Sequence, residues 1–338
     1  MRQATMTSPG VIEFACVDAP QPGPGQVRVQ VKRIGVCGSD IHVNKGLHPF
    51  TKYPVIQGHE WSGVIESRGP GVSDLAVGTK VTATPQVVCG TCRPCRRGDY
   101  NICDSLKVQG FQAPGCAQDL FVTDARKIVP LPDNFSFEQG ALVEPAAVAV
   151  HCTGRPGELA HKNVAVTGAG PIGNLVAQLC LSRGARVLLT DVSDHRLEVA
   201  RQCKIPFTAN ARRESLAQAS RRCFGNDGFD AAFDCAGAQA ALDTIIDSIQ
   251  KGGTIVVVAV YEHRPTLDMS MVGDRELRLT GTLMYKYEDY VRAVELISAG
   301  EIVTAPLESK HFPFEQYAAA YRFIDEQGEK SMKVFIDL

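Results

Sequence analysis

Residues 163–191 read NVAVTGAGPIGNLVAQLCLSRGARVLLTD, and this stretch decides the fold of much of the chain. The apolar run 164–167 predicts a strand, the glycines after it predict a tight turn, and residues 171–183 have the apolar spacing of a helix. A second strand-like run then ends at Asp191. Parallel strands need a long, usually helical crossover, so this order of elements predicts a parallel α/β sheet.

The glycines of this turn follow the pattern G-x-G-x-x-G after a strand and at the start of a helix, which is the context that the dinucleotide-binding motif requires. The first glycine allows the tight turn, the second lets a pyrophosphate approach the backbone, and the third allows close helix–strand packing. The free N–H groups of the helix N-terminus then face the phosphates. We therefore predict cofactor contacts at Gly168, Gly170, Pro171, Ile172 and Gly173.

Asp191 ends the second strand, about 20 residues beyond the motif, where an acid binds the adenosine ribose hydroxyls. A carboxylate at this point repels a 2′-phosphate, so the sequence predicts NAD rather than NADP. Arg196 is a counter-signal, because an arginine near this hydroxyl can accommodate the phosphate. An NADP-dependent carbonyl reductase is therefore the alternative.

Further apolar runs at 229–237, 252–260 and 277–285 alternate with helical segments and predict the rest of the parallel sheet. Residues 1–135 instead contain short β-like runs between glycine and proline turns, which is typical of a β-rich domain. The chain also ends on a strand-like segment, MKVFIDL. We expect a cofactor domain at 148–286, inserted between 1–147 and 287–338 of the other domain.

A second stretch, CGSDIHVNKGLHPFTKYPVIQGHE at 37–60, gathers metal-ligand residue types in two turns. Cys37, Asp40 and His42 lie within six residues, and His59 and Glu60 follow Gly58. Thiolate, imidazole and carboxylate are the ligands of a catalytic zinc that keeps one position open. The alternative is a buried structural cysteine beside surface histidines.

A third stretch, CGTCRPCRRGDYNIC, places Cys89, Cys92, Cys95 and Cys103 in a C-x2-C-x2-C-x7-C pattern. Four thiolates close a tetrahedral zinc site, so we predict a structural zinc lobe at about 86–106. A zinc-ribbon nucleic-acid module is the alternative, favoured by three arginines. Nearby acids offset that charge, and no aromatic residue lies between the arginines to stack on bases.

Length and composition limit the number of domains, the classes of partner and the compartment. A chain of 338 residues predicts two domains, and a formal net charge of −2 gives no general attraction to nucleic acid or anionic membranes. No apolar run approaches the roughly 20 residues needed to span a bilayer, and the first residues lack the apolar core of a signal peptide. The cysteines outside the lobe are scattered as reduced thiols would be, so we expect a cytoplasmic protein.

Together these residues resemble the zinc-dependent medium-chain dehydrogenases over essentially the whole chain, and within them the polyol (sorbitol), threonine and butanediol dehydrogenase branch. The resemblance is carried by CGSDIH at 37–42, GHE at 58–60, the four-cysteine lobe, Glu144-Pro145 and GAGPIG at 168–173. It implies a GroES-like, β-rich catalytic domain joined to a Rossmann cofactor domain. Similar enzymes form dimers or tetramers, so it also implies a homo-oligomer.

The resemblance assigns the ligands of a catalytic zinc. Cys37 and His59 bind the metal, and Glu60 and Glu144 complete its shell or reach it through water. From its own surroundings Glu144 reads as an ordinary surface glutamate, and only the resemblance changes that interpretation. Asp40 falls where a partner of the zinc histidine lies, and orienting a ligand imidazole is a sensible role for a carboxylate.

The implied activity is reversible, NAD-linked oxidation of a secondary alcohol to a ketone. Zinc would act as the Lewis acid, and Ser39 and His42 fall where the family keeps its proton relay. The alternative from another class is a nucleotide-sensing or nucleic-acid-binding protein without catalysis. The presence of both Cys37 and His59 argues against it.

The substrate is only partly constrained. Sorbitol dehydrogenases carry an arginine where this chain has Met284, before Tyr285, so sorbitol itself is disfavoured. A polyol, a sugar acid or a vicinal diol remains open. Tyr53 and Tyr285 are candidate substrate contacts, with ordinary packing as the alternative.

Overall fold

Two β-sheets organise the chain, and each belongs to a different unit of the structure. The computed structural model describes residues 1–338. The first unit contains Met1–Glu144, Lys286–Ser298 and Glu308–Leu338, and the second contains Pro145–Tyr285 and Ala299–Leu307.

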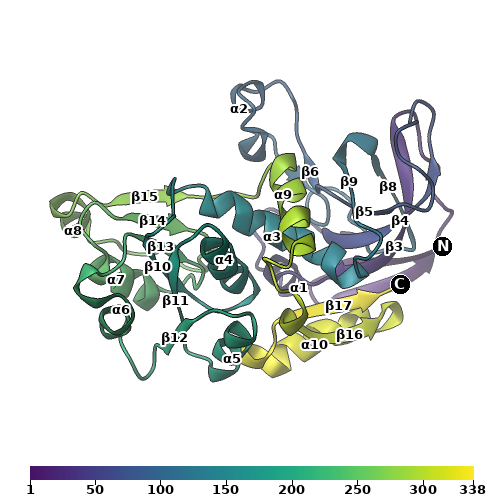
Figure 1. The fold of residues 1–338 in the computed structure, drawn as a ribbon. Coiled ribbons are helices and arrows are strands. Elements are labelled where there is room, and N and C mark those ends of the chain that lie inside the picture. The colour runs from purple at the N-terminus through teal and green to yellow at the C-terminus, as the bar shows by residue number, and fades with distance from the viewer. The chain divides into compact units, whose positions relative to one another are not determined.

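The second unit is built on a six-stranded parallel sheet (Figure 1). Its strands are β10 (Asn163–Thr167), β11 (Arg186–Asp191), β12 (Phe207–Asn210), β13 (Ala231–Asp234), β14 (Thr254–Val257) and β15 (Arg278–Gly281). The order β12-β11-β10-β13-β14-β15 is, counted from the first strand of the unit, 3-2-1-4-5-6, the doubly wound arrangement. The connecting helices are α4 (Pro171–Ser182), α5 (Asp194–Gln202), α6 (Leu216–Phe224), α7 (Gln239–Ser248) and α8 (Met269–Asp274).

The geometry of the turn between β10 and α4 requires glycine at two positions. Gly168 has a φ of +89°, a left-handed conformation that favours glycine. A Cβ on Gly173 would lie 1.7 Å from the Gly168 carbonyl oxygen, so no larger residue fits there. The expected strand, turn, helix and second strand are all found in this stretch.

The last two strands of this sheet are shorter than the apolar runs suggest. Only residues 254–257 of the run 252–260 are paired, and only 278–281 of the run 277–285. The ladder of β14 ends because the N–H groups of Val258 and Ala259 both donate to the Asp234 carbonyl oxygen. Apolar character alone therefore overestimates these two strands.

Residues 299–307 belong to the second unit through a reciprocal pair of hydrogen bonds. The Gln178 side-chain amide on α4 donates to the Val303 carbonyl at 3.2 Å and accepts from the Val303 N–H at 2.6 Å. Gln178 is buried, so both of its polar ends are satisfied inside the unit.

The first unit is built on a seven-stranded sheet in the order β16-β17-β3-β4-β5-β9, with β8 also paired to β3. These strands are β3 (Gln26–Gly35), β4 (Glu60–Arg68), β5 (Lys80–Ala83), β8 (Leu120–Asp124), β9 (Ile128–Pro130), β16 (Glu308–Pro313) and β17 (Lys333–Asp337). Two small sheets join β1 (Arg2–Ser8) to β2 (Val11–Cys16) and β6 (Gln86–Val87) to β7 (Lys107–Val108). The helices are α1 (Gly38–Asn44), α2 (Arg93–Arg96), α9 (Tyr287–Ser298) and α10 (Tyr317–Gln327), and α3 (Phe137–Thr153) contains the boundary between the units.

Strand β3 shows how this unit forms its core. Val27, Val29 and Val31 alternate with polar residues and are fully buried, as expected for a strand with one face on the core. The C-terminal strand β17 pairs antiparallel with the end of β3, with Phe335 opposite Gly35. This pairing brings residue 333 beside the segment that leads into Cys37, because Val36 donates to the Val334 carbonyl at 2.9 Å.

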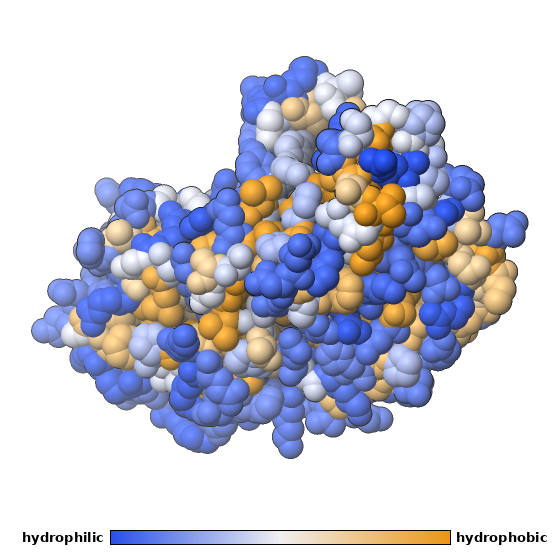
Figure 2. Space-filling model, turned by 45° about the vertical axis from the view of Figure 1, so that its right-hand side comes forward, coloured by the Kyte–Doolittle hydropathy of each residue, from blue (hydrophilic) through white to orange (hydrophobic).

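The surface is mainly hydrophilic on the face that Figure 2 shows, with apolar side chains gathered in smaller groups. None of the helices combines the length and the apolar character that crossing a membrane requires.

Candidate active site

Three candidate ligands from two separate segments of the first unit meet at one point. Cys37 directly precedes α1, His59 directly precedes β4, and Glu60 is the first residue of β4. One ligand atom from each lies within 4.8 Å of the others. His59 and Glu60 are almost completely buried. A thiol, an imidazole and a carboxylate converging in this way form a donor set that fits zinc.

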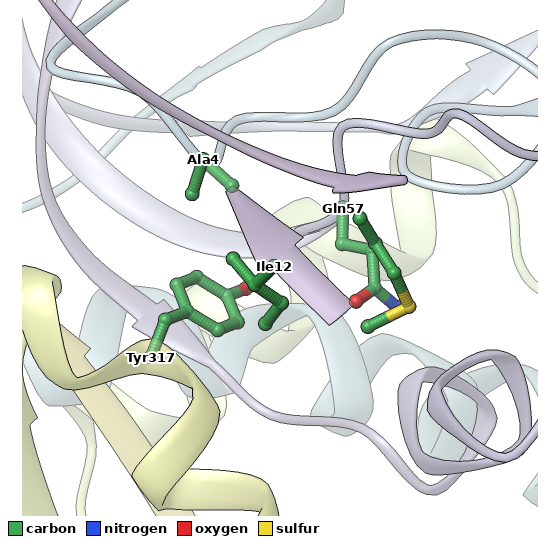
Figure 3. A pocket seen from close by; sticks show the side chains of 6 residues that line it. Ala4, Ile12, Gln57 and Tyr317 are labelled. Carbon is green, nitrogen blue, oxygen red and sulfur yellow. The ribbon is translucent and has the colours of Figure 1, made fainter. Parts of the chain in front are cut away.

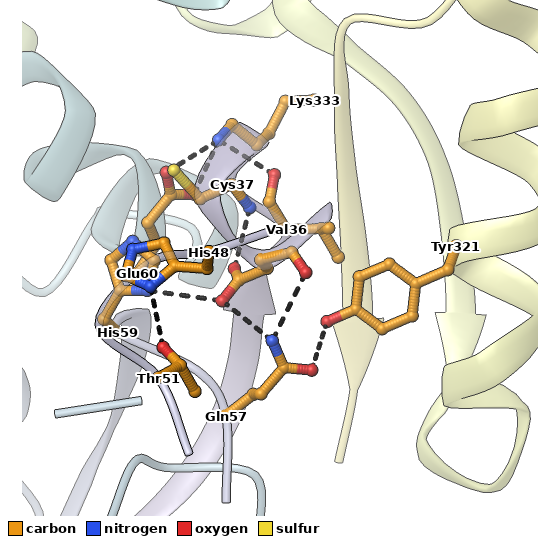
Figure 4. Close-up of polar contacts among 10 residues, drawn as sticks. Val36, Cys37, His48, Thr51, Gln57, His59, Glu60, Tyr321 and Lys333 are labelled. Atoms are coloured by element: carbon orange, nitrogen blue, oxygen red, sulfur yellow. Dashed lines mark hydrogen bonds and ion pairs between the residues drawn. The ribbon is translucent and has the colours of Figure 1, made fainter. Parts of the chain in front are cut away.

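Asp40 joins the helix α1 to this cluster. Its Oδ2 accepts from the Cys37 N–H at 2.9 Å, which closes the first turn of the helix. Its Oδ1 lies 3.6 Å from His59 Nδ1, a close electrostatic contact that is longer than a good hydrogen bond (Figure 4). Since Nδ1 faces Asp40, Nε2 is the imidazole nitrogen left for a metal.

The surroundings shift the pKa values of the two candidate ligands Cys37 and His59. Burial raises the pKa of the Cys37 thiol, and the negative charge of Glu60 adds to this effect. Burial lowers the pKa of His59, but the charges and hydrogen bonds of Asp40 and Cys37 together outweigh burial, and the pKa lies well above its usual value. A metal ion would displace protons from both ligands, so its binding strengthens as the pH rises.

Lys333 is a site residue that the sequence did not reveal. Its Nζ donates to both carboxylate oxygens of Glu60, at 2.6 and 2.9 Å, and to the Val36 carbonyl at 3.2 Å (Figure 4). Lys333 is 3 % exposed and Glu60 is 1 % exposed, so the ion pair is buried. Burial lowers the pKa of Lys333, but Glu60, Cys37 and Glu144 together outweigh burial, and the pKa is raised. The one available signal was a lysine inside the apolar strand MKVFIDL.

Glu144 lies on α3 and is 5 % exposed, which excludes the ordinary surface role suggested by its sequence context. Its negative charge acts on Lys333 together with that of Glu60. Lys333 therefore forms its ion pair with Glu60, and the negative charge of Glu144 adds a smaller stabilisation of the ammonium.

The two candidate relay residues lie on α1, where Ser39 and His42 are three positions apart and so share a face of the helix. Both are partly exposed.

An aromatic column connects His48 to the candidate ligands. His48 stacks on Phe111 with ring centroids 4.8 Å apart, and Phe111 is tilted against His59 at the same distance. Thr51 Oγ1 fixes His48 through Nδ1 at 2.8 Å. Phe111 was not singled out from the sequence, because a lone phenylalanine carries no signal of such a role.

The two tyrosines proposed as substrate contacts have different surroundings. The Tyr53 hydroxyl donates to the Val43 carbonyl oxygen, at the end of α1. Tyr285 is fully buried and lies in the second unit. Substrate contact stays a prediction for both.

The four cysteines at 89–103 also come together. Cys103 Sγ lies 3.6 Å from Cys89 Sγ and 3.8 Å from Cys92 Sγ, and all four sulfurs, Cys95 included, lie within 4.8 Å of one another. Zinc–sulfur bonds of about 2.3 Å give tetrahedral edges of roughly 3.8 Å, so these spacings fit zinc. Hydrogen bonds from the Thr91 and Cys92 N–H groups lower the pKa of Cys89 to about 5, which favours its thiolate.

The glycine turn of the second unit is open to a ligand. A Cβ on Gly170 would meet nothing within 4 Å, so its backbone can be approached closely. Pro171, Ile172 and Gly173 begin α4, where the first N–H groups of a helix have no intrahelical partner.

Asp191 is tied to this turn. Its Oδ2 accepts from the Ala169 N–H at 2.6 Å and its Oδ1 from the Ser193 N–H at 2.8 Å. An Arg196 guanidinium nitrogen lies 3.9 Å from the same carboxylate. Asp191, which favours NAD, and Arg196, which favours NADP, therefore lie side by side.

Two family models match the chain. Residues 23–133 match the alcohol dehydrogenase GroES-like domain, and residues 171–299 match the zinc-binding dehydrogenase domain. The chain is 34% identical over 314 residues to a 2-dehydro-3-deoxy-L-galactonate 5-dehydrogenase of Pseudoalteromonas atlantica, with 92% of each chain covered. It is 33% identical to a sorbitol dehydrogenase of Arabidopsis thaliana, covering 94% of this chain and 90% of that protein.

The structure also resembles that of a 2R,3R-butanediol dehydrogenase from Bacillus subtilis, with a TM-score of 0.91, 25% identity and coverage of 100% of this chain and 99% of that one. These matches confirm the predicted fold class, a GroES-like domain with a Rossmann-type parallel sheet. The chain belongs to the zinc-dependent medium-chain alcohol dehydrogenase family, as an oxidoreductase of its polyol and threonine dehydrogenase branch.

Proposed function

We propose that this protein oxidises a secondary alcohol to a ketone with NAD, and that the reaction is reversible. The observation that carries the proposal is the convergence of Cys37, His59 and Glu60 within 4.8 Å in a buried site. The relatives named above act on sugar acids, polyols and vicinal diols, which supports the same class of substrate here.

Cys37, His59, Glu60 and Glu144 would hold the catalytic zinc. The metal supplies a Lewis acid that lowers the pKa of a bound alcohol. The Cys37 thiolate and the two carboxylates carry three negative charges, which Zn²⁺ and Lys333 together balance. Asp40 holds the His59 ring with Nε2 free, at the contact of 3.6 Å described above.

Ser39 and His42 would carry the proton that the alcohol releases. The hydroxyl of Ser39 passes it on, and the imidazole of His42 accepts it as a general base. The glycine turn of the second unit orients the nicotinamide cofactor as the hydride acceptor. The Phe111 ring packs against His59 and limits access of water on that side.

The substrate test is NAD reduction with sugar acids, polyols, vicinal diols and threonine, on full-length protein of determined zinc content. We expect turnover with at least one sugar acid, polyol or vicinal diol. Absence of turnover with all of them, on protein that holds zinc and binds NAD, contradicts the proposal. Tyr53 and Tyr285 are proposed to contact the substrate, and Tyr53→Phe should then raise KM for the alcohol without changing KM for NAD.

Asp191 should set the cofactor preference. A like charge beside the 2′-phosphate costs several kcal/mol, so we expect kcat/KM with NAD to exceed that with NADP by about a hundredfold. Asp191→Asn keeps the shape of the side chain but removes the charge, and should narrow this ratio. Steady-state kinetics with both cofactors measure it, with Arg196→Met as the matched variant that should widen the ratio. Equal use of NADP by the unchanged protein would support the reductase alternative.

The lobe at 86–106 is proposed to hold a structural zinc through Cys89, Cys92, Cys95 and Cys103. Because structural zinc contributes directly to folding free energy, Cys92→Ser should lose one zinc per chain and lower the melting temperature. Metal analysis and thermal unfolding measure the two effects. Cys16→Ser is the matched control, since Cys16 is exposed on β2. An unchanged zinc content in Cys92→Ser would contradict the lobe assignment.

The remaining assignments follow from the same proposal. The first unit serves as the catalytic domain and the second as the cofactor domain, close to the bounds 1–147 and 287–338 against 148–286. We also propose a cytoplasmic homo-oligomer, a dimer or a tetramer, which light scattering of the purified chain would measure. No nucleic acid or membrane partner is proposed.

A further inference from the structure

We propose that Gln57 and Tyr321 are positioning residues that hold Asp40, and through it the His59 ring, in the geometry that the catalytic zinc requires. The inference rests on the proposed zinc site. It assigns a role to two residues whose side chains are not expected to bind the metal. Gln57 and Tyr321 lie 264 positions apart in the sequence.

The contacts form one continuous path (Figure 4). The Tyr321 hydroxyl donates to Gln57 Oε1 at 2.8 Å. Gln57 Nε2 lies 3.4 Å from both the Asp40 carbonyl oxygen and Asp40 Oδ1. The same Oδ1 is the atom that faces His59 Nδ1 at 3.6 Å. A hydroxyl on α10 is thus linked through an amide to the carboxylate that orients the candidate zinc ligand.

Every member of this path is sealed from solvent. The exposed fractions are 2 % for Tyr321, 3 % for Gln57, 1 % for Asp40 and 4 % for His59. Buried polar groups that lose a partner cannot turn to water, so each contact is costly to break. Such a path is therefore suited to holding one arrangement of its members.

The orientation of the Gln57 amide is fixed from two sides. Asp40 offers two acceptor oxygens, so the nitrogen end of the amide must face it, and the oxygen end then accepts from Tyr321. Beside Gln57 is a narrow cavity of about 10 Å³ (Figure 3). Its other walls are mainly apolar, formed by Ala4, Met6, Ile12, Ala117 and Tyr317. An amide turned into this cavity would find few partners.

The helix that carries Tyr321 is itself held firmly. The Tyr317 ring packs beside the Tyr321 ring with centroids 5.8 Å apart, and α10 contacts β16 and β17. Strand β17 in turn begins with Lys333, which pairs with Glu60. The C-terminal segment 317–333 therefore supports the candidate ligands from two sides, His59 through Tyr321 and Glu60 through Lys333.

Tyr321→Phe is the most specific test, because it keeps the ring and removes only the hydroxyl. Gln57 then loses the partner of its oxygen, and Asp40 and His59 gain freedom. Partners of metal ligands contribute tenfold to a hundredfold in metal affinity or activity, and we expect about tenfold faster loss of the catalytic zinc to a chelator. kcat should fall by a similar factor, whereas KM for NAD should not change.

The experiment compares the full-length zinc protein with Tyr321→Phe, Gln57→Leu and the double variant. Zinc release to a chelator is followed over time, and the cobalt-substituted proteins are compared by visible absorption, which reports ligand geometry without any turnover. Thr82→Val is the matched control, since it removes a buried hydroxyl of the same unit that bonds the Trp61 carbonyl at 2.7 Å instead of Gln57.

Faster zinc release and an altered cobalt spectrum in the single variants would support the inference. The double variant should release zinc no faster than the more affected single variant, because residues of one path do not act additively. The inference would be overturned if the folded Tyr321→Phe protein had the same zinc release and cobalt spectrum as the unchanged protein and Thr82→Val. It would also be overturned if the effects of Tyr321→Phe and Gln57→Leu on zinc release were additive. A Cys37→Ala protein that retains as much zinc as the unchanged chain would instead overturn the proposed zinc site itself.

Discussion

Replacing Cys37 by alanine should lower kcat/KM for alcohol oxidation by about a thousandfold. The thiol is one of three candidate ligands that meet within 4.8 Å, and without it the site loses its only thiolate donor to zinc. A metal that polarises the reacting oxygen contributes several kcal/mol, and each 1.4 kcal/mol is about a factor of ten in rate. Binding of NADH should survive, because the glycine turn belongs to the second unit.

Zinc content, NADH fluorescence titration and steady-state kinetics measure these three effects on one preparation. Cys116→Ala is the matched control, since Cys116 is a fully buried cysteine of the same unit outside the ligand cluster. It should lose some stability but keep its zinc. If the Cys37→Ala protein lacks the catalytic zinc but turns over at the wild-type rate, the assignment of Cys37 as a catalytic zinc ligand is wrong.

Replacing Lys333 by methionine should destabilise the protein by about 3–5 kcal/mol, the usual cost of removing one partner of a buried ion pair. Glu60 would keep its charge without the ammonium that now bonds both of its oxygens. The cost arises from the carboxylate left behind, so the double variant Lys333→Met, Glu60→Gln should recover much of the loss. Chemical denaturation of the zinc-free and zinc-loaded proteins measures both values.

Lys333→Arg is the conservative variant for this pair. It retains a cation but places a larger, planar group in a fully packed position, so we expect a smaller loss than for methionine. A Lys333→Met protein as stable as the unchanged chain would contradict the importance of the buried pair between Lys333 and Glu60.

The parts of the fold that could be predicted are those whose signals are local. The strand, glycine turn and helix at 164–182 follow from apolar spacing and from the G-x-G-x-x-G pattern, all within one short segment. The four sulfurs of the cysteine lobe likewise come from a single loop, and their spacing in the sequence predicts their meeting in space.

The support of the candidate site could not be predicted, because it depends on pairing between distant parts of the chain. Glu60 and Lys333 are 273 residues apart, and Gln57 and Tyr321 are 264 apart. The pairing of β3 with both β17 and β4 brings Lys333 to Glu60, and α10, which contacts β17, carries Tyr321 to Gln57. A lysine in an apolar strand and a tyrosine in an amphipathic helix have many commoner explanations.

The measurement that tests the central claim most directly is activity as a function of zinc at the Cys37 site. Zinc is removed from the full-length protein with a chelator and returned in steps, and NADH formation is followed with the best substrate of the alcohol panel. We predict that activity disappears with the more readily removed zinc and returns in proportion as about one zinc per chain is restored. Activity that persists unchanged after this zinc has gone would contradict a zinc-dependent oxidation at this site.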